Sequence, residues 1–252
     1  MKMSVIFLFM YNLKLHFSKW VASLLPEKIV YRYLIWVSKI PSSKIFQEGF
    51  KLTNPSKTVV DIGANRGIVT YYMSQTFPKV HTFEPNTDLI PFLQKVLPKN
   101  CTFHPCGLSN IPGENILSVA MEEGIPINGR GKIFEQKDPN GKFQDLKIRL
   151  ETLDEQNLEN IGLIKIDVEG HEEKAIQGAE KTISKFHPIL IVEIEKRHTK
   201  KPTSEIIHYI ESLGYDGFFF EGELRRPVSE FKEHMQDPGY PYYINDFLFL
   251  PK

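Results

Sequence analysis

The sequence has little cysteine, no excess of charge of either sign and no long apolar run, and each of these gaps excludes a class of protein. Cys101 and Cys106 are the only cysteines in 252 residues, too few for a thiolate metal cluster or a disulfide scaffold. We expect both to be reduced thiols, as in a cytosolic protein. Lys and Arg together number 31, as do Asp and Glu, so the net charge is zero. Nothing attracts a polyanion to the chain as a whole, and nucleic acid is not an expected partner.

The most apolar run at the N-terminus, "SVIFLFMY", is far shorter than the roughly 20 residues that a membrane-spanning helix needs. It begins like a signal peptide, but Lys14, His16 and Lys19 follow where a cleavage region is short and neutral. At helical spacing, the apolar residues up to Leu24 share one face. We therefore predict that residues 1–54 form an amphipathic helical extension that covers the main domain or a partner chain. Contact of residues 1–25 with a membrane surface is the alternative, so the expected location is the cytoplasm or the periphery of a membrane.

From residue 55 onward, strand-like and helix-like segments alternate. We expect strands at 58–63, 79–85, 101–109, 162–170 and 187–195, and helices at 68–77, 86–97, 171–184 and 203–213. Residues 111–152 are expected to form an irregular insertion or a hairpin, and "YDGFFFEG" with "NDFLFLP" a closing antiparallel pair. This alternation predicts an α/β domain over residues 55–252, with a mostly parallel sheet covered on both faces. Ligands of such sheets bind at the carboxyl ends of the strands.

The turn "DIGANRG" after the first of these strands lacks the third glycine of a dinucleotide-binding turn and the Gly-Lys-Ser/Thr of a P-loop. It does have an acid, Asp61, beside a turn that lets a ligand approach the backbone. An acid suits a positively charged ligand and suits a pyrophosphate poorly. Glu84 ends the next strand, at about the 20-residue offset at which an acid binds ribose hydroxyls. A cationic ligand with a ribose indicates S-adenosylmethionine.

The motifs "VVDIGANRG", "HTFEPN", "GLS", "TLD", "LIKIDVEGHEEKAIQGA", "ILIVEI" and "NDFLFLP" follow one another in the order of a known family. With them the sequence resembles the FkbM family of S-adenosylmethionine-dependent methyltransferases, from about residue 57 to residue 250. The resemblance implies a Rossmann-like class I methyltransferase fold, with a seven-stranded, mostly parallel sheet whose last strand is antiparallel. It also implies methyl transfer to a hydroxyl, often on a sugar or a natural-product scaffold.

The resemblance assigns cofactor-binding residues by position. The turn residues, which would line the methionine half of the cofactor, are Asp61, Gly63, Ala64, Asn65 and Gly67, and the residues around the ribose and adenine are Phe83, Glu84, Pro85 and Asn86. Many such enzymes have an acid after the third strand, which meets the adenine amino group. Here that region is "CGLSN", so this contact would come from Ser109, Asn110 or the backbone.

The segment "IDVEGHE" is where we expect the chemistry. Methyl transfer needs the acceptor hydroxyl to be positioned in line with the sulfonium and to lose its proton. We predict Asp167, Glu169 and His171 as catalytic residues, with His171 as the base because an imidazole is partly neutral near pH 7. A purely structural role at the start of the helix stays open for Glu169 and His171, and Glu172 and Glu173 are expected to be solvated charges.

No metal is expected, but one alternative remains. Asp167, His171 and Glu193 would lie close together if their strands are neighbours, and such a set suits Mg²⁺ or Mn²⁺. The basic stretch "KRHTKK" is either a solvated loop or the rim of a site for an anionic acceptor. Two other functions also stay open: a catalytically silent S-adenosylmethionine-binding or scaffold protein of this fold, and a dinucleotide enzyme. The sequence does not indicate which hydroxyl, of a small molecule or a glycan, is the acceptor, or whether the chain forms oligomers.

Overall fold

The structure is a computed structural model that describes residues 25–122, 125–134, 143–199 and 201–252. The chain divides into two compact units, Met1–Ser38 and Lys39–Lys252. In the first unit the described residues form the helix α2 (Glu27–Val37), while the amphipathic helix expected before it lies outside the described residues. Within the described part of the chain, no helix combines the length and the apolar character needed to cross a membrane.

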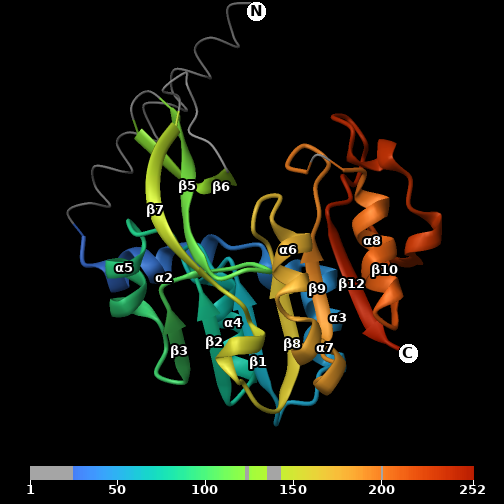
Figure 1. Cartoon of the computed structure of the whole chain (residues 1–252), viewed down its shortest axis with the longest axis horizontal. Coiled ribbons are helices and arrows are strands. Elements are labelled where there is room, and N and C mark those ends of the chain that lie inside the picture. Colours follow the sequence, from blue (N-terminus) through green and yellow to red (C-terminus); the bar gives the residue numbers. More distant parts are fainter. Residues whose placement is uncertain (1–24, 123–124, 135–142, 200) are drawn as a thin grey trace, which may run out of the picture. The chain divides into compact units, whose positions relative to one another are not determined.

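The second unit is built on one large sheet (Figure 1). In the described residues it has eight strands in the order β11-β10-β12-β9-β8-β1-β2-β3. Their bounds are β1 (Thr58–Ile62), β2 (Lys79–Phe83), β3 (Cys101–His104), β8 (Ile161–Ile166), β9 (Ile189–Glu193), β10 (Tyr215–Glu221), β11 (Leu224–Pro227) and β12 (Asp246–Pro251). The five strands from β3 to β9 are parallel to one another, and β12 is antiparallel to both β9 and β10. The expected sheet with a reversed last strand is confirmed, and β11 extends it by one edge strand.

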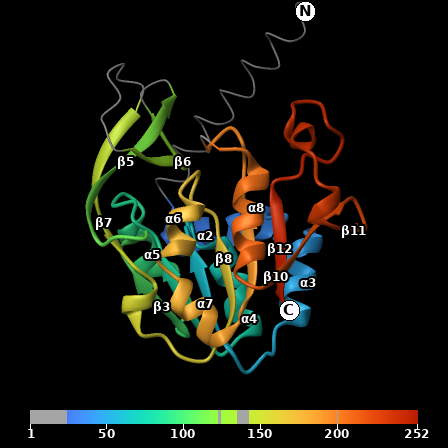
Figure 2. The ribbon, with the colours of Figure 1, turned by 45° about the vertical axis from the view of Figure 1, so that its right-hand side comes forward.

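Helices cover both faces of this sheet because successive strand residues point to opposite sides (Figure 2). Val60, Ile164 and Leu190 pack with residues of α6, α7 and α8. Their neighbours Val59, Leu163 and Ile191 pack with residues of α3 and α4 on the other face. The helices of this unit are α3 (Lys44–Leu52), α4 (Ile68–Thr76), α5 (Ile90–Val96), α6 (Glu172–Gln177), α7 (Glu180–Phe186) and α8 (Thr203–Ser212), with short 3-10 helices η1 (Ile40–Ser42), η2 (Asp154–Gln156), η3 (Val228–Glu230) and η4 (Glu233–Gln236).

Helix α3 belongs to the same compact unit as the sheet, although it lies within the predicted extension. Ile45 and Phe46 are buried in the core beside Val59, Leu163 and Leu248. The single helix expected at 171–184 is two helices, α6 and α7, because α6 ends at Gly178.

A second, four-stranded sheet holds much of the segment expected as an insertion. Among the described residues its order is β4-β7-β5-β6, with bounds β4 (Gly107–Leu108), β5 (Gly113–Glu122), β6 (Ile125–Phe134) and β7 (Phe143–Glu151). The antiparallel pair β5–β6 confirms the expected hairpin, and β7 adds a long strand on its other side. Leu117 and Val119 of β5 are buried with Ile148 and Leu150 of β7, so this sheet has a small core of its own.

Candidate active site

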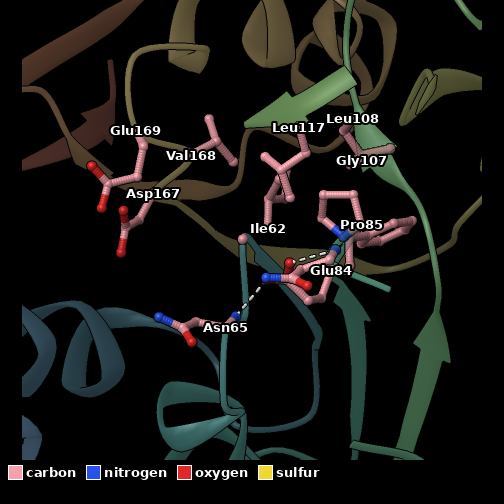
Figure 3. A pocket seen from close by; sticks show the side chains of 13 residues that line it. Ile62, Asn65, Glu84, Pro85, Gly107, Leu108, Leu117, Asp167, Val168 and Glu169 are labelled. Atoms are coloured by element: carbon pink, nitrogen blue, oxygen red, sulfur yellow. Dashed lines mark hydrogen bonds between the residues drawn. The ribbon is translucent and has the colours of Figure 1, made fainter. Parts of the chain in front are cut away.

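A pocket of about 720 Å³, its open mouth included, lies at the carboxyl ends of β1, β2 and β8 (Figure 3). Its lining residues are Ile62, Gly63, Asn65, Phe83, Glu84, Pro85, Asn86, Gly107, Leu108, Leu117, Asp167, Val168 and Glu169. Pro85, Leu108 and Leu117 lie together on one side of the pocket, and Asp167 and Glu169 lie on the other side (Figure 3). The pocket therefore has an apolar end and an acidic end.

The turn after β1 needs glycine at its first position. Gly63 has φ +76°, and a Cβ there would lie 1.8 Å from the carbonyl oxygen of Asp167. The backbone N–H groups of Gly63 and Ala64 both donate to the carbonyl of Phe83, at 3.0 Å each. The turn thus passes directly between the ends of β2 and β8. Helix α4 begins after this turn, at Ile68, which follows Gly67.

Glu84 is fixed by the backbone on both of its oxygens. Its Oε2 accepts the N–H of Asn65 at 2.7 Å, and its Oε1 accepts the N–H of Asn86 at 2.8 Å (Figure 3). Burial raises the pKa of Glu84, and these two hydrogen bonds oppose that rise. Each carboxylate oxygen keeps a further lone pair for a ligand, as recognition of two neighbouring hydroxyls requires.

Asp61, in contrast, lies behind the pocket wall and is fully buried. Its Oδ2 accepts the hydroxyl of Thr70 at 2.5 Å. Its Oδ1 has no hydrogen bond within the described residues, but Lys165 Nζ lies 3.2 Å away as an ion pair. Lys165 Nζ also donates to the carbonyl of Gly63 at 2.8 Å and lies 3.6 Å from Asp167 Oδ2. Burial by itself would lower the pKa of Lys165, but the two acids raise it above its ordinary value. Lys165 thus carries the countercharge for both acids.

Three carboxyl groups meet where β8, β9 and β12 are neighbours. Asp167 follows β8, Glu193 ends β9, and Asp246 begins β12 and pairs with Glu193 in the register of the sheet. Burial, and then Asp167, raise the pKa of Glu193 to about 9 and that of Asp246 to about 7. Asn245 Nδ2 donates to Glu193 Oε1 at 2.8 Å. We call Asp167, Glu193 and Asp246 the acidic edge. Glu193 and Asp246 hold their protons to higher pH than ordinary carboxyl groups.

Glu169 lines the pocket from a strained backbone position, with φ +54°. His198 Nδ1 lies 2.6 Å from its Oε2. The expectation of solvated charge at Glu172 is wrong: this residue is 2% exposed. Its Oε1 accepts the N–H groups of Val168 and Gly170, at 3.1 and 2.9 Å, so it holds the turn that carries Asp167 and Glu169.

His171 does not line the pocket. It is buried at the start of α6, and its Nε2 shares a hydrogen bond of 3.0 Å with the hydroxyl of Ser109, another predicted site residue. Burial, and then the charge of Lys174, lower the pKa of His171 to about 4. The structure brings these two residues together but outside the pocket wall. The other predicted site residues that do not line it are Asp61, Ala64, Gly67, Asn110 and Glu193.

No group of three metal-binding side chains is found in the described part of the chain. Several pocket residues were not expected: Lys165 behind the wall, and Ile62, Gly107, Leu108, Leu117 and Val168 on it. The signal for Lys165 was a cation inside the apolar run "GLIKIDV", two positions before an acid on the same face of a strand. No sequence signal identifies Leu117, which reaches the pocket from the second sheet.

Comparison with known proteins agrees with this geometry. A crystal structure of methyltransferase FkbM from Methylobacillus flagellatus matches with a TM-score of 0.53 at 18% identity, over 84% of this chain and 47% of that one. This chain thus spans about half the length of that protein. The fold is the class I methyltransferase fold.

The family comparison is more specific. The family model described as the methyltransferase FkbM domain matches residues 61–216. Methyltransferase sdnD of Sordaria araneosa is 28% identical, over 71% of this chain and 84% of that protein. The chain belongs to the FkbM family of S-adenosylmethionine-dependent methyltransferases.

Proposed function

We propose that this chain transfers the methyl group of S-adenosylmethionine to a hydroxyl of a sugar, glycan or natural-product acceptor. The observation that carries the proposal is the pocket with Glu84 fixed between an apolar end and an acidic end. Adenine suits the apolar end, the ribose diol suits Glu84, and a sulfonium suits the acids.

The pocket residues fit this cofactor in one further respect. Asn65 lines the pocket, and its Oδ1 is a buried oxygen with no hydrogen-bond partner among the described residues. Because buried polar atoms are normally paired, this oxygen is available to accept from the amino group of a bound ligand. Asp61 is fully buried and does not line the pocket, so Asp167 and Glu169 are the acids that face the positively charged end of the ligand.

The acidic edge supplies what hydroxyl methylation needs from the protein. Bound S-adenosylmethionine provides a methyl group whose bond to sulfur breaks, with the electron pair left on sulfur, as the acceptor oxygen forms the new bond. The carboxyl groups of Asp167, Glu193 and Asp246 orient that oxygen, and one of them that is ionised takes its proton. We assign the proton acceptor to this edge rather than to His171, because His171 is hydrogen-bonded to Ser109 outside the pocket wall.

Calorimetric titration with S-adenosylmethionine tests the cofactor site. In Glu84→Ala we expect the Kd to rise at least about 10²-fold, because two ribose hydroxyls lose charged acceptors worth about 1.5–3 kcal/mol each. Glu114→Ala, a matched change at an exposed residue of β5, should leave the Kd unchanged. Equal affinity in Glu84→Ala would remove this residue from the site.

A second measurement separates an enzyme from a silent binding protein. The native chain is incubated with methyl-labelled S-adenosylmethionine and a panel of sugar, glycan and polyketide hydroxyl acceptors. We expect label to appear in an acceptor as an O-methyl group. Tight cofactor binding with no labelled acceptor would favour the catalytically silent alternative.

A further inference from the structure

A second pocket, of about 750 Å³ with its mouth, lies beside the first one along the edge of the sheet. Three chain segments form it: the start of α3, the turn between β10 and β11, and the approach to β12. Its lining residues are Ser42, Ser43, Lys44, Ile45, Phe220, Gly222, Glu223, Tyr242, Tyr243, Ile244, Asn245 and Asp246. We call it the β12 pocket. None of its lining residues also lines the first pocket.

The β12 pocket leads to the acidic edge. Asp246 lines it and pairs in register with Glu193 on the neighbouring strand. Asn245 also lines it, and its side chain donates to Glu193. The charges that act on Asp246 come from Asp167, Glu195 and Lys165, and Asp167 lines the first pocket. A molecule in the β12 pocket would therefore lie against Asp246, whose electrostatic neighbour Asp167 lines the first pocket.

The lining of the β12 pocket is polar and aromatic and carries little unmatched positive charge. Ser42 and Ser43 provide hydroxyl groups, and Tyr242 and Tyr243 provide phenol side chains. Its lysine, Lys44, forms an ion pair of 2.5 Å with Glu223 at the rim. Side chains of this kind form hydrogen bonds to hydroxyl groups and pack their rings on the C–H faces of a sugar. A hydrocarbon chain would leave the polar groups unpaired, and an anion would meet Asp246 with no free cation in the lining to balance it.

The nearby basic stretch does not change this balance. Lys196 is paired with Asp237, Arg197 with Glu195, and Lys201 with Glu173. Each of these three cations faces a carboxylate, whereas Lys200 lies outside the described residues. Among the described residues of this stretch, Lys196, Arg197 and Lys201 are therefore neutralised by the protein itself.

The backbone around the β12 pocket is held in unusual conformations. Tyr243 has φ +37°, which a bulky residue rarely adopts. Gly222 has φ +64°, and a Cβ there would lie 3.0 Å from the ring of Tyr242. Such strain persists only where the surrounding structure fixes it, and it gathers at binding sites. Here it places two adjacent tyrosines at one cavity.

We propose that the β12 pocket binds the methyl acceptor, and that this acceptor is a neutral sugar whose hydroxyl reaches the acidic edge. This inference rests on the proposed methyl transfer, since it names the substrate class and the entrance for the same reaction.

Saturation-transfer difference NMR tests the binding of sugars directly. The full chain, loaded with S-adenosylhomocysteine, is mixed in turn with the methyl glycosides of glucose, galactose, mannose, rhamnose and fucose. We expect saturation transfer to at least one glycoside. If none receives saturation, the inference is overturned.

The variant Ser43→Trp fills the β12 pocket. Ser43 precedes α3 but makes no side-chain hydrogen bond that caps the helix, so its replacement removes no capping interaction. We expect the glycoside Kd to rise at least about tenfold, which corresponds to about 1.4 kcal/mol. The matched control, Ser229→Trp, places the same ring at an exposed serine outside the pocket and should bind the glycoside like the native chain.

Tyr242→Ala supports the test if the tryptophan disturbs folding, because this tyrosine is 55% exposed. It should weaken glycoside binding by removing a stacking surface. Unchanged glycoside affinity in both Ser43→Trp and Tyr242→Ala would overturn the inference. All variants should bind S-adenosylmethionine like the native chain. Failure of the native chain to bind S-adenosylmethionine would instead contradict the proposed function.

Discussion

At the scale of single residues, Lys165 determines which acid is available to a ligand. Its ammonium group lies between Asp61 and Asp167 and donates to the carbonyl of Gly63. Removing one partner of a buried ion pair costs about 3–5 kcal/mol, because the other charge stays buried without a partner. Asp61 is therefore tied to the turn that comes after it, whereas Asp167, with a third of its side chain exposed, stays open to the pocket.

His171 gives a prediction about stability. Its pKa is lowered to about 4 by burial and then by Lys174, whereas an imidazole in the unfolded chain titrates near 6.5. Between these values the unfolded state binds a proton that the folded state does not. The stabilisation is therefore complete above pH 6.5 and is lost as the pH falls toward 4. In His171→Gln, which does not titrate, the free energy of unfolding should fall less steeply in this window, by up to about 1.4 kcal/mol per pH unit.

Urea unfolding of both proteins at a series of pH values measures this difference. Other titrating groups are the same in both proteins, so their contributions cancel in the comparison. Turnover of His171→Gln near pH 7 should stay within about tenfold of the native value, since the residue does not line the pocket. Parallel stability curves would contradict the lowered pKa of His171. A loss of turnover of about 10²-fold together with its pH dependence would restore His171 as the base.

At the scale of helices and strands, the sequence predicts those elements that follow from alternating strand-like and helix-like segments and from local turns. The strands expected from buried apolar runs and the antiparallel closing pair are present because strand burial follows directly from composition. Side-chain direction at the helix start after β8 could not be predicted. His171 and Glu172 both belong to a motif of apparent surface charge, yet both are buried by contacts with Ser109 and with the turn at Val168. The contact of His171 with Ser109 depends on how β4 and α6 pack together, which the local sequence does not show. Glu172 turns back to backbone N–H groups of its own turn, and residue spacing alone does not distinguish this from a solvated side chain.

Helix α3 gives a prediction at this scale. Deleting residues 1–38 should leave a folded chain with native S-adenosylmethionine affinity, because the compact unit that holds the sheet begins at Lys39. Deleting residues 1–54 should lower the melting temperature sharply or make the chain insoluble. That deletion removes Ile45 and Phe46 from the core, and each large apolar side chain contributes about 2–5 kcal/mol.

Thermal unfolding followed by circular dichroism, together with calorimetric titration, compares the two deletions. Phe46→Ala in the full chain is the control for loss of the packing contact without loss of the helix. If the chain lacking residues 1–54 is as stable as the chain lacking residues 1–38, α3 does not belong to the folding unit of the sheet.

At the scale of the whole molecule, the two pockets lie in series along one edge of the sheet. The first lies over β1, β2 and β8, the acidic edge spans β8, β9 and β12, and the β12 pocket continues to the turn after β10. The reversal of β12 is what brings Asp246, at its start, level with Glu193, at the end of β9. In the proposed reaction, the donor would lie against Asp167 in the first pocket and the acceptor against Asp246 in the β12 pocket.

The pH dependence of turnover follows from this arrangement. Burial, and then Asp167, raise the pKa of Asp246 to about 7, so below that pH the carboxyl is protonated and cannot accept a proton. Turnover with a glycoside that binds should therefore rise with pH, by about tenfold per unit below pH 7, and level off above it.

In Asp246→Asn the rate should be at least about 10²-fold lower and this rise should vanish, while S-adenosylmethionine affinity should stay native. Because the proposed proton acceptor is a carboxyl group, we expect a chelator to leave the native profile unchanged. If Asp246→Asn keeps the rise, the proton acceptor is Asp167 or Glu193. If a chelator abolishes turnover and Mg²⁺ or Mn²⁺ restores it, the acidic edge works by holding a metal ion.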